Sequence, residues 1–291
     1  MMILTWFVGI VCILIGGMQS TGEANSLVHN RVRRHGHHHF HNKDPWSGLE
    51  GSLKHVSVGL AGVWGVNCKD QIYYREDTYE EEVLGRDWVE VEGKLVQVDV
   101  GDDVVWGVNS CQNIYYREGI LGRNPTGNDW VLVEGSLKHV SVSQHGHVWG
   151  VNKHDDIYHR IGASFWNPGG DSWKKICGHL KQISVGEAGV WGVNSAHNIY
   201  YRDGTFGDPE SDPNGTGWTH VDGQLNYISS AENVYGVNCN GCVFKRVGRC
   251  STNPVGTNWE SHQGSLKQIE SFSLMVWGTN KHNNVYEKDQ E

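Results

Sequence analysis

One short motif is repeated six times in this 291-residue chain: an aromatic residue, Gly, Val or Thr, then Asn. An aliphatic–aromatic pair such as Ile72-Tyr73 follows each copy, and a Gly-x-Leu unit precedes it. Successive copies start 42 to 44 residues apart, at Trp64, Trp106, Trp149, Trp191, Tyr235 and Trp277. A stride this regular is the signature of a repeat architecture, in which each copy forms one structural unit.

Each copy predicts four short strands. Apolar and polar residues alternate within it, as in the segment 137–142, and a period of two favours strand over helix. A second series of tryptophans marks the fourth strand, at Trp46, Trp88, Trp130, Trp173, Trp218 and Trp259. Because four antiparallel strands in roughly 40–45 residues make one propeller blade, we predict an all-β fold, a six-bladed β-propeller of four-stranded antiparallel blades.

The two ends of the repeat region predict how the ring closes. The sixth copy ends at 286–291 without a terminal tryptophan strand, whereas Trp46 stands before the first Gly-x-Leu unit with no repeat of its own. We expect the N-terminal strand around Trp46 to supply the outer strand of the sixth blade, which removes an exposed edge. The propeller would then span residues 46–291. An open solenoid is the alternative, and it would leave two incomplete ends.

The first 22 residues predict a signal peptide. Residues 3–17 are nearly all apolar and residues 18–22 are small and polar, which suits a hydrophobic segment followed by a cleavage site. The apolar run is shorter than the roughly 20 residues that span a bilayer. We therefore expect a secreted, extracellular protein without a transmembrane segment. An uncleaved signal anchor is the alternative.

Residues 23–45 predict a disordered propeptide and tail. The run Arg31-Val32-Arg33-Arg34 resembles the sites of furin-type convertases, so cleavage after Arg34 is an open possibility. The histidine-rich stretch that follows could bind Cu²⁺, Ni²⁺ or Zn²⁺, although a solvated tail explains it equally; its histidines are His35, His37, His38, His39 and His41. The predicted propeller itself requires no cofactor.

The net charge indicates which ligands are excluded, and the cysteines and one sequon indicate which covalent modifications to expect. A formal net charge of -9 argues against nucleic acid, whose binding depends on clustered Lys and Arg. Six cysteines follow the apolar segment, and in an exported chain they predict disulfides, although the sequence does not choose among the fifteen pairings. They are Cys68, Cys111, Cys177, Cys239, Cys242 and Cys250. Asn214-Gly215-Thr216 is an N-glycosylation sequon.

The repeat resembles the tectonin-repeat lectins, a group that includes fish-egg lectins and some tachylectins. The motifs that carry the resemblance are Gly-x-Leu-Lys-x-Val-Ser-Val-Gly, Val-Trp-Gly-Val-Asn and Asn-Ile-Tyr-Tyr-Arg, and they occur most completely at 178–186, 190–194 and 198–202. The resemblance covers about residues 46–288. It implies a propeller that binds glycans of the N-acetylglucosamine type or bacterial surface polysaccharides such as lipopolysaccharide, in innate defence. The fifth and sixth copies depart from the pattern, so we expect any repeated site to be weakest or altered there.

Three sets of residues are candidates for sugar binding, and each set has a structural alternative. The inner tryptophans could stack on sugars, or could fill the space between blades: Trp64, Trp106, Trp149 and Trp191. The asparagines after them could bind hydroxyls, or could hold a turn: Asn67, Asn109, Asn152 and Asn194. The arginines that end the third strand could bind sugars or phosphates, or could form ion pairs: Arg75, Arg117 and Arg202. Loops such as 124–127 could bind ligands or be plain turns.

The repetition itself favours a lectin over an enzyme. Catalysis needs unlike residues that converge at one place, whereas here the polar residues recur with the blades. Several similar weak sites suit multivalent binding. We therefore predict a secreted carbohydrate-binding lectin without enzymatic activity. The alternative is an extracellular protein-binding or matrix scaffold with a metal-binding His-rich tail.

Overall fold

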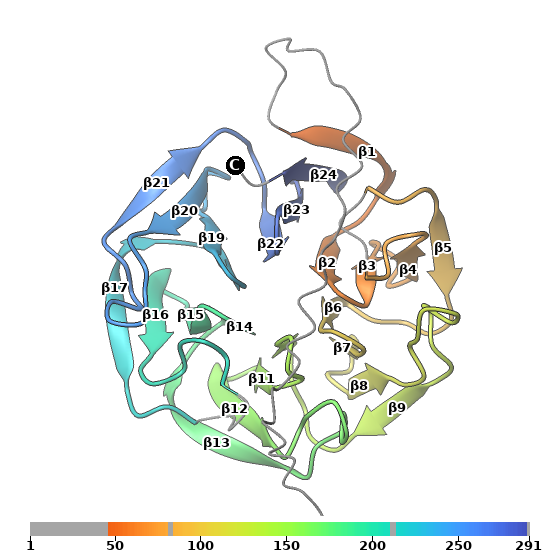
Figure 1. Ribbon diagram of the computed structural model, residues 1–291, viewed down its shortest axis with the longest axis horizontal. Helices are drawn as coiled ribbons and strands as arrows, with labels where there is room; N and C mark the ends of the chain where they lie inside the picture. The colour runs from red at the N-terminus through yellow and green to blue at the C-terminus, as the bar shows by residue number, and fades with distance from the viewer. Residues whose placement is uncertain (1–45, 81–83, 210–213, 290–291) are drawn as a thin grey trace, which may run out of the picture. The chain divides into compact units, whose positions relative to one another are not determined.

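In the computed structural model of this chain, residues 46–80, 84–209 and 214–289 are described. They form 24 strands and no helix, so no helix long and apolar enough to cross a membrane occurs among them. The strands make six four-stranded antiparallel sheets arranged as a ring (Figure 1). The predicted six-bladed β-propeller is confirmed.

Five blades each use four consecutive strands. Blade 1 comprises β2 (His55–Gly59), β3 (Gly62–Val66), β4 (Ile72–Arg75) and β5 (Trp88–Val91). Blade 2 comprises β6 (Gln97–Val100), β7 (Val105–Val108), β8 (Ile114–Arg117) and β9 (Trp130–Val133). Blade 3 comprises β10 (His139–Val142), β11 (Val148–Val151), β12 (Asp156–Ile161) and β13 (Ser172–His179). Blade 4 comprises β14 (Gln182–Gly186), β15 (Gly189–Val193), β16 (Asn198–Arg202) and β17 (Trp218–Gln224). Blade 5 comprises β18 (Tyr227–Ser230), β19 (Val234–Val237), β20 (Val243–Val247) and β21 (Asn258–His262).

Blade 6 joins the two ends of the ring. It comprises β22 (Gln268–Phe272), β23 (Met275–Thr279), β24 (Asn284–Asp289) and, as its outer strand, β1 (Ser47–Ser52). β1 pairs antiparallel with β24, with Gly48 opposite Tyr286. The indole Nε1 of Trp46 donates a hydrogen bond to the Gln263 carbonyl at 2.6 Å. The expected closure by the N-terminal strand is therefore confirmed.

The core lies between the blades. The six inner aromatic residues are 3% exposed or less and pack with valines, isoleucines and leucines of neighbouring sheets: Trp64, Trp106, Trp149, Trp191, Tyr235 and Trp277. Each blade is also tied to the one before it, because the backbone N–H of its Gly-x-Leu leucine donates to a carbonyl in the preceding blade's turn, as from Leu180 to Asp155 at 2.9 Å. The same bond from Leu53 to Asn283 joins blade 6 to blade 1.

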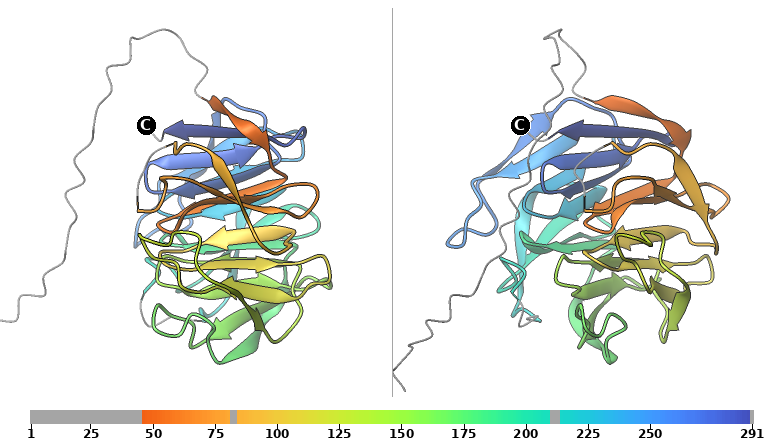
Figure 2. Two further views of the ribbon diagram at one scale, coloured as in Figure 1. Left: turned by 90° about the vertical axis from the view of Figure 1, so that its right-hand side faces the viewer. Right: turned by 45° about the vertical axis from the view of Figure 1, so that its right-hand side comes forward.

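The up-and-down strand order gives the ring two different faces (Figure 2). The turn between the second and third strands of every blade and the Gly-x-Leu connectors lie on one face, which we call the groove face. The hairpins between the first and second strands and the loops between the third and fourth strands lie on the other face, which we call the loop face.

The groove-face turn requires a left-handed residue in every blade. Five blades use a non-glycine residue there, including Gln112 with φ 67°, whereas blade 5 uses Gly241. Because an L side chain is strained in this region, we expect Gln112→Gly to stabilise the protein by about 1 kcal/mol and Gly241→Ala to destabilise it by a similar amount. Urea unfolding of both variants measures the two signs, and a destabilised Gln112→Gly protein would refute the argument.

Candidate functional site

A groove opens on the groove face beside blade 4. It encloses a cavity of about 300 Å³, lined by Ile157, Gly178, His179, Leu180, Asn194, Tyr200 and Trp218. Leu180 forms its buried floor at 2% exposure, whereas the tyrosine, the tryptophan and the asparagine are partly exposed. Blade 3 contributes Ile157 from β12 and Gly178 and His179 from the end of β13, Leu180 lies in the connector, and the remaining residues come from the turn and the two outer strands of blade 4.

An equivalent groove of about 290 Å³ lies beside blade 6. Its lining residues are Trp46, Gly264, Ser265, Leu266, Asn280, Lys281, His282 and Tyr286. The leucine, the asparagine, the tyrosine and the tryptophan of the blade 4 groove all have counterparts here, such as Leu266 for Leu180 and Tyr286 for Tyr200. The tryptophan is Trp46, so the strand that closes the ring also completes this groove.

A left-handed glycine brings the connector against the tryptophan. Gly178 has φ 117°, and a Cβ atom there would lie 3.0 Å from Nε1 of Trp218. Only glycine allows this approach without strain, which explains why a glycine stands at this position in all six blades. The same indole Nε1 donates to the carbonyl of Cys177 at 2.8 Å, so the position of the ring is fixed.

The predicted arginines pack against the rings of the outer tryptophans. Arg202 is 7% exposed, and its Cζ atom lies 5.2 Å from the centroid of the Trp218 ring. Its Nε donates to the carbonyl of Asn214 at 2.8 Å, which ties the loop to the blade. Arg75 and Arg117 are 3% and 2% exposed and are placed in the same way, over Trp88 and Trp130.

These arginines also form ion pairs in blades 1, 2, 3 and 5. The partners are carboxylates before the connector glycine, and Arg117 holds the pKa of Glu92 below its usual range through a hydrogen bond. Blade 4 has Cys177 in place of the carboxylate, so Arg202 lacks this pair. The arginines therefore position the groove wall, and the buried guanidinium groups do not line the grooves at blades 4 and 6.

The predicted asparagines shape the turn that borders each groove. In Asn194, Oδ1 accepts hydrogen bonds from the backbone N–H groups of Ala196 and Asn198, at 3.0 and 2.9 Å. Asn67, Asn109 and Asn152 do the same in blades 1 to 3. Some of the amide nitrogens also bond within the blade, since Nδ2 of Asn67 donates to Oε1 of Gln71 at 3.0 Å and Nδ2 of Asn152 donates to Oδ2 of Asp156 at 3.2 Å. In the blade 6 groove, Nδ2 of Asn280 donates to the Tyr286 hydroxyl at 3.3 Å.

The inner tryptophans lie away from the grooves. Trp64, Trp106, Trp149 and Trp191 are 1% exposed or less, and Nε1 of Trp64 and of Trp191 donates to a backbone carbonyl at 2.9 Å. A ligand could reach these indoles only if the blades separated. The arrangement agrees with the packing interpretation of this series.

Other predicted features lie elsewhere on the ring. The six cysteines of the described residues are exposed and form no disulfide in this structure, so the disulfide pairing stays a prediction. Asn214 is partly buried, and its Oδ1 lies 3.1 Å from Nδ1 of His159. The loop at 124–127 is a turn on the loop face, held by Arg117 through the Thr126 carbonyl. The signal peptide, Arg34 and His35–His41 lie outside the described residues.

The blade 4 groove contains one predicted binding residue, Asn194, together with a leucine and a tyrosine that the sequence marks only as parts of the repeat. A tyrosine and a tryptophan ring, a leucine floor and one asparagine amide can hold a ligand with both apolar faces and hydroxyl groups. Blade 5 has Phe244 in place of the tyrosine, so its groove lacks that hydroxyl. No cluster of His, Cys, Asp and Glu suited to a metal ion occurs in the part of the chain that the structure describes.

Comparisons with known proteins agree with this architecture. The family model of the tectonin domain matches residues 15–135 and 128–281. The chain is similar to the perivitellin-2 31 kDa subunit of Pomacea maculata, with 30% identity over 103 residues. That match covers 35% of this chain and 35% of the relative, about a third of its length.

Solved structures show the same fold at low identity. Prp20p from Saccharomyces cerevisiae gives a TM-score of 0.52 at 11% identity, covering 80% of this chain and 70% of that one. Human WBSCR16 gives 0.51 at 11% identity, covering 82% and 72%. Likeness at this level of identity shows the fold alone.

Proposed function

Because this chain belongs to the tectonin family, we propose that it is a carbohydrate-binding lectin whose ligands lie in the grooves of the groove face. The observation that carries the proposal is that one set of side chains recurs around the ring and encloses a cavity beside both blade 4 and blade 6. The set consists of a leucine, an asparagine, a tyrosine and a tryptophan.

The chemistry of the groove suits a neutral sugar. The rings of Tyr200 and Trp218 offer apolar surfaces for the C–H faces of a pyranose, or for the methyl of an N-acetyl group. The amide nitrogen of Asn194 can donate to a hydroxyl or an acetamide oxygen. The residue between glycine and leucine, His179 beside blade 4 and Ser265 beside blade 6, varies between grooves and would tune the preference.

Repetition of the groove supports multivalent binding. Sites on one rigid ring can engage several sugars of the same surface, so weak contacts sum to a useful avidity. We propose N-acetylglucosamine-type glycans or bacterial surface glycans such as lipopolysaccharide as ligands, and a secreted, extracellular role in innate defence. We also propose that the protein is not an enzyme, because its polar groups recur from blade to blade instead of converging.

The test is a glycan array with competition by free N-acetylglucosamine. We expect binding that the free sugar inhibits, and we expect Tyr200→Ala with Tyr286→Ala to weaken it about fivefold at each groove, because each substitution removes one aromatic contact of roughly 1 kcal/mol. Trp166→Ala is the matched control, since it removes an aromatic side chain that is 90% exposed on the loop face. Retention by protein partners without sugar competition would instead support the extracellular scaffold.

A further inference from the structure

A second cavity, unrelated to the grooves, lies on the loop face between blades 2 and 3. It has a volume of about 240 Å³, and its wall includes Asp102, Asp103, Leu121 and Phe165. Apolar side chains are exposed around it: Leu121 at 46%, Phe165 at 56% and Trp166 at 90%. A patch of this kind on a protein surface marks an interaction site more often than chance exposure does.

The charges around this cavity are negative. Oδ1 of Asp102 is buried and has no hydrogen-bond partner among the described residues. Burial, together with the charges of Asp103, Asp208 and Glu232, raises the pKa of Asp102 to about 7, and only the neighbouring His145 opposes this. Burial and two of the same carboxylates also raise the pKa of Glu187. The nearby cation, Arg117, is paired with Glu92.

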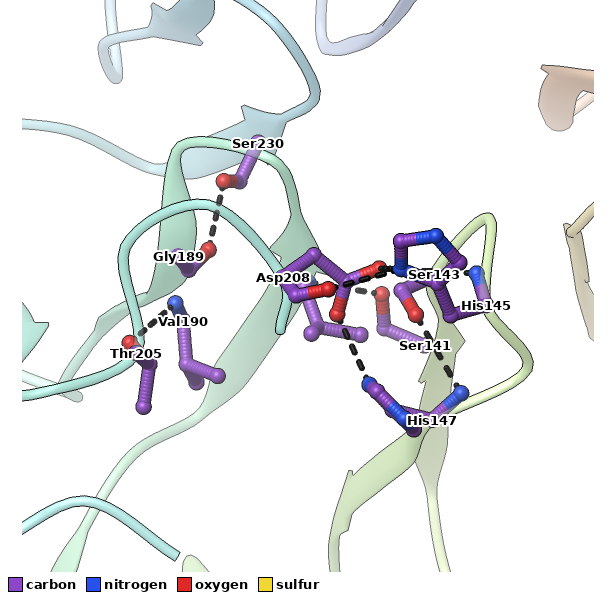
Figure 3. Close-up of polar contacts among 10 residues, drawn as sticks. Ser141, Ser143, His145, His147, Gly189, Val190, Thr205, Asp208 and Ser230 are labelled. Carbon is purple, nitrogen blue, oxygen red and sulfur yellow. Dashed lines mark hydrogen bonds and ion pairs between the residues drawn. The ribbon is translucent and has the colours of Figure 1, made fainter. Parts of the chain in front are cut away.

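The hairpin that borders the cavity is braced by a neighbouring blade. Asp208, in the loop between β16 and β17, accepts from Nδ1 of His147 at 2.8 Å, and its carboxylate lies 3.2 Å from Nδ1 of His145 (Figure 3). The backbone N–H of His147 donates to Oγ of Ser143 at 3.2 Å within the same hairpin. These contacts attach the hairpin, which contributes Gln144 and Gly146 to the cavity wall, to blade 4.

We propose that this cavity and the exposed Phe165–Trp166 pair dock a protein segment that carries a lysine or arginine beside an apolar side chain. The cation would pair with Asp102, and the apolar neighbour would cover Phe165 and Trp166, whose rings are 4.6 Å apart in a T-shaped arrangement. An unpartnered carboxylate in a partly buried position gains from an incoming cation.

One observation favours a protein segment over a free small molecule. Trp166 stands outside the cavity and almost fully in solvent, and exposed tryptophans of this kind are common anchors of protein interfaces.

Fluorescence polarisation with two labelled, capped peptides tests the proposal. The basic probe is Leu-Lys-Leu-Lys-Leu and the acidic match is Leu-Glu-Leu-Glu-Leu. At pH 8 we expect the basic peptide to bind at least tenfold more tightly. Asp102→Asn and Trp166→Ala should each weaken it about fivefold or more, whereas Asp129→Asn, which removes an exposed carboxylate of blade 2, should leave it unchanged.

The pH dependence supplies an independent readout. Because protonation of Asp102 competes with the cation, binding of the basic peptide should weaken about fivefold to tenfold from pH 8 to pH 6. Asp102→Asn should therefore reduce this dependence on pH. Equal affinity for the two peptides, or equal effects of Asp102→Asn and Asp129→Asn, would overturn the proposal by showing attraction to net charge alone.

Discussion

Replacing Trp46 with alanine should destabilise the propeller by about 3–5 kcal/mol, the usual cost of truncating a buried tryptophan. Trp46 is 8% exposed and packs in the core of blade 6 with Leu266 and Ile269. The substitution also removes the hydrogen bond from the indole to the Gln263 carbonyl. Because Trp46 anchors β1, its loss would loosen the outer strand that protects β24.

Urea unfolding followed by tryptophan fluorescence or circular dichroism measures this loss. Trp166→Ala makes the same chemical change at a side chain that is 90% exposed, so it should alter the free energy of unfolding by no more than about 0.5 kcal/mol. Equal destabilisation by the two substitutions would contradict the view that the N-terminal strand closes the ring.

The fold could be predicted because equivalent residues of the six copies can be aligned directly in the sequence. Six copies at a constant stride define the strands, and the unmatched Trp46 indicates the closure. The same alternation could not distinguish accessible from inaccessible tryptophans. In a propeller both surfaces of a blade are covered by neighbouring blades, so Trp64 and its equivalents are buried although they alternate with glycine and valine.

The grooves could have been inferred only in part. Gly-x-Leu, Asn, Tyr and Trp were recognised as repeat markers, but nothing in their spacing shows that Gly178, Asn194 and Trp218 meet at one place. That meeting depends on the left-handed glycine, which brings the connector against the indole. The sequence indicates the grooves only when the repeat residues that lie on one face of the ring are considered together.

Contacts outside the repeat were not predictable. Asp208 reaches His145 and His147 from an irregular loop of the next blade. The disulfides stay a prediction, because that prediction rests on the expected compartment. In the structure the six cysteines of the described residues are exposed, and the ring is closed by strand pairing.

Burial of Asp99 should make the protein less stable at neutral and alkaline pH than at acidic pH. Asp99 lines the central channel, a cavity bordered by the first strands of all six blades. Asp99 is 7% exposed on β6, where its Oδ2 accepts from the backbone N–H of Val142 at 2.7 Å and its Oδ1 from Ser57 at 3.2 Å. Burial raises its pKa from 3.8 to about 7. Burial and the charge of Asp99 also raise the pKa of Glu270, on the first strand of blade 6, well above its usual value.

The direction of the effect follows from proton binding. Between about pH 4 and pH 7, Asp99 keeps its proton in the folded state and has lost it in the unfolded state. The folded state therefore binds more protons, so the contribution of Asp99 is fully present below about pH 4 and is lost as the pH rises to 7. His139 acts in the opposite sense at acidic pH, because burial lowers its pKa to about 3.

Asp99→Asn removes this contribution together with the effect of the Asp99 charge on Glu270, because asparagine can still accept the hydrogen bond from Val142 but carries no charge. We expect the variant to match the wild type near pH 4 and to exceed its free energy of unfolding by about 2–4 kcal/mol at pH 8. The contribution of His139 is common to both proteins and cancels in the difference. Asp129→Asn, at an exposed site, should show no such divergence with pH. A constant difference between Asp99→Asn and wild type across this range would mean that Asp99 is ionised throughout and that the channel solvates its charge.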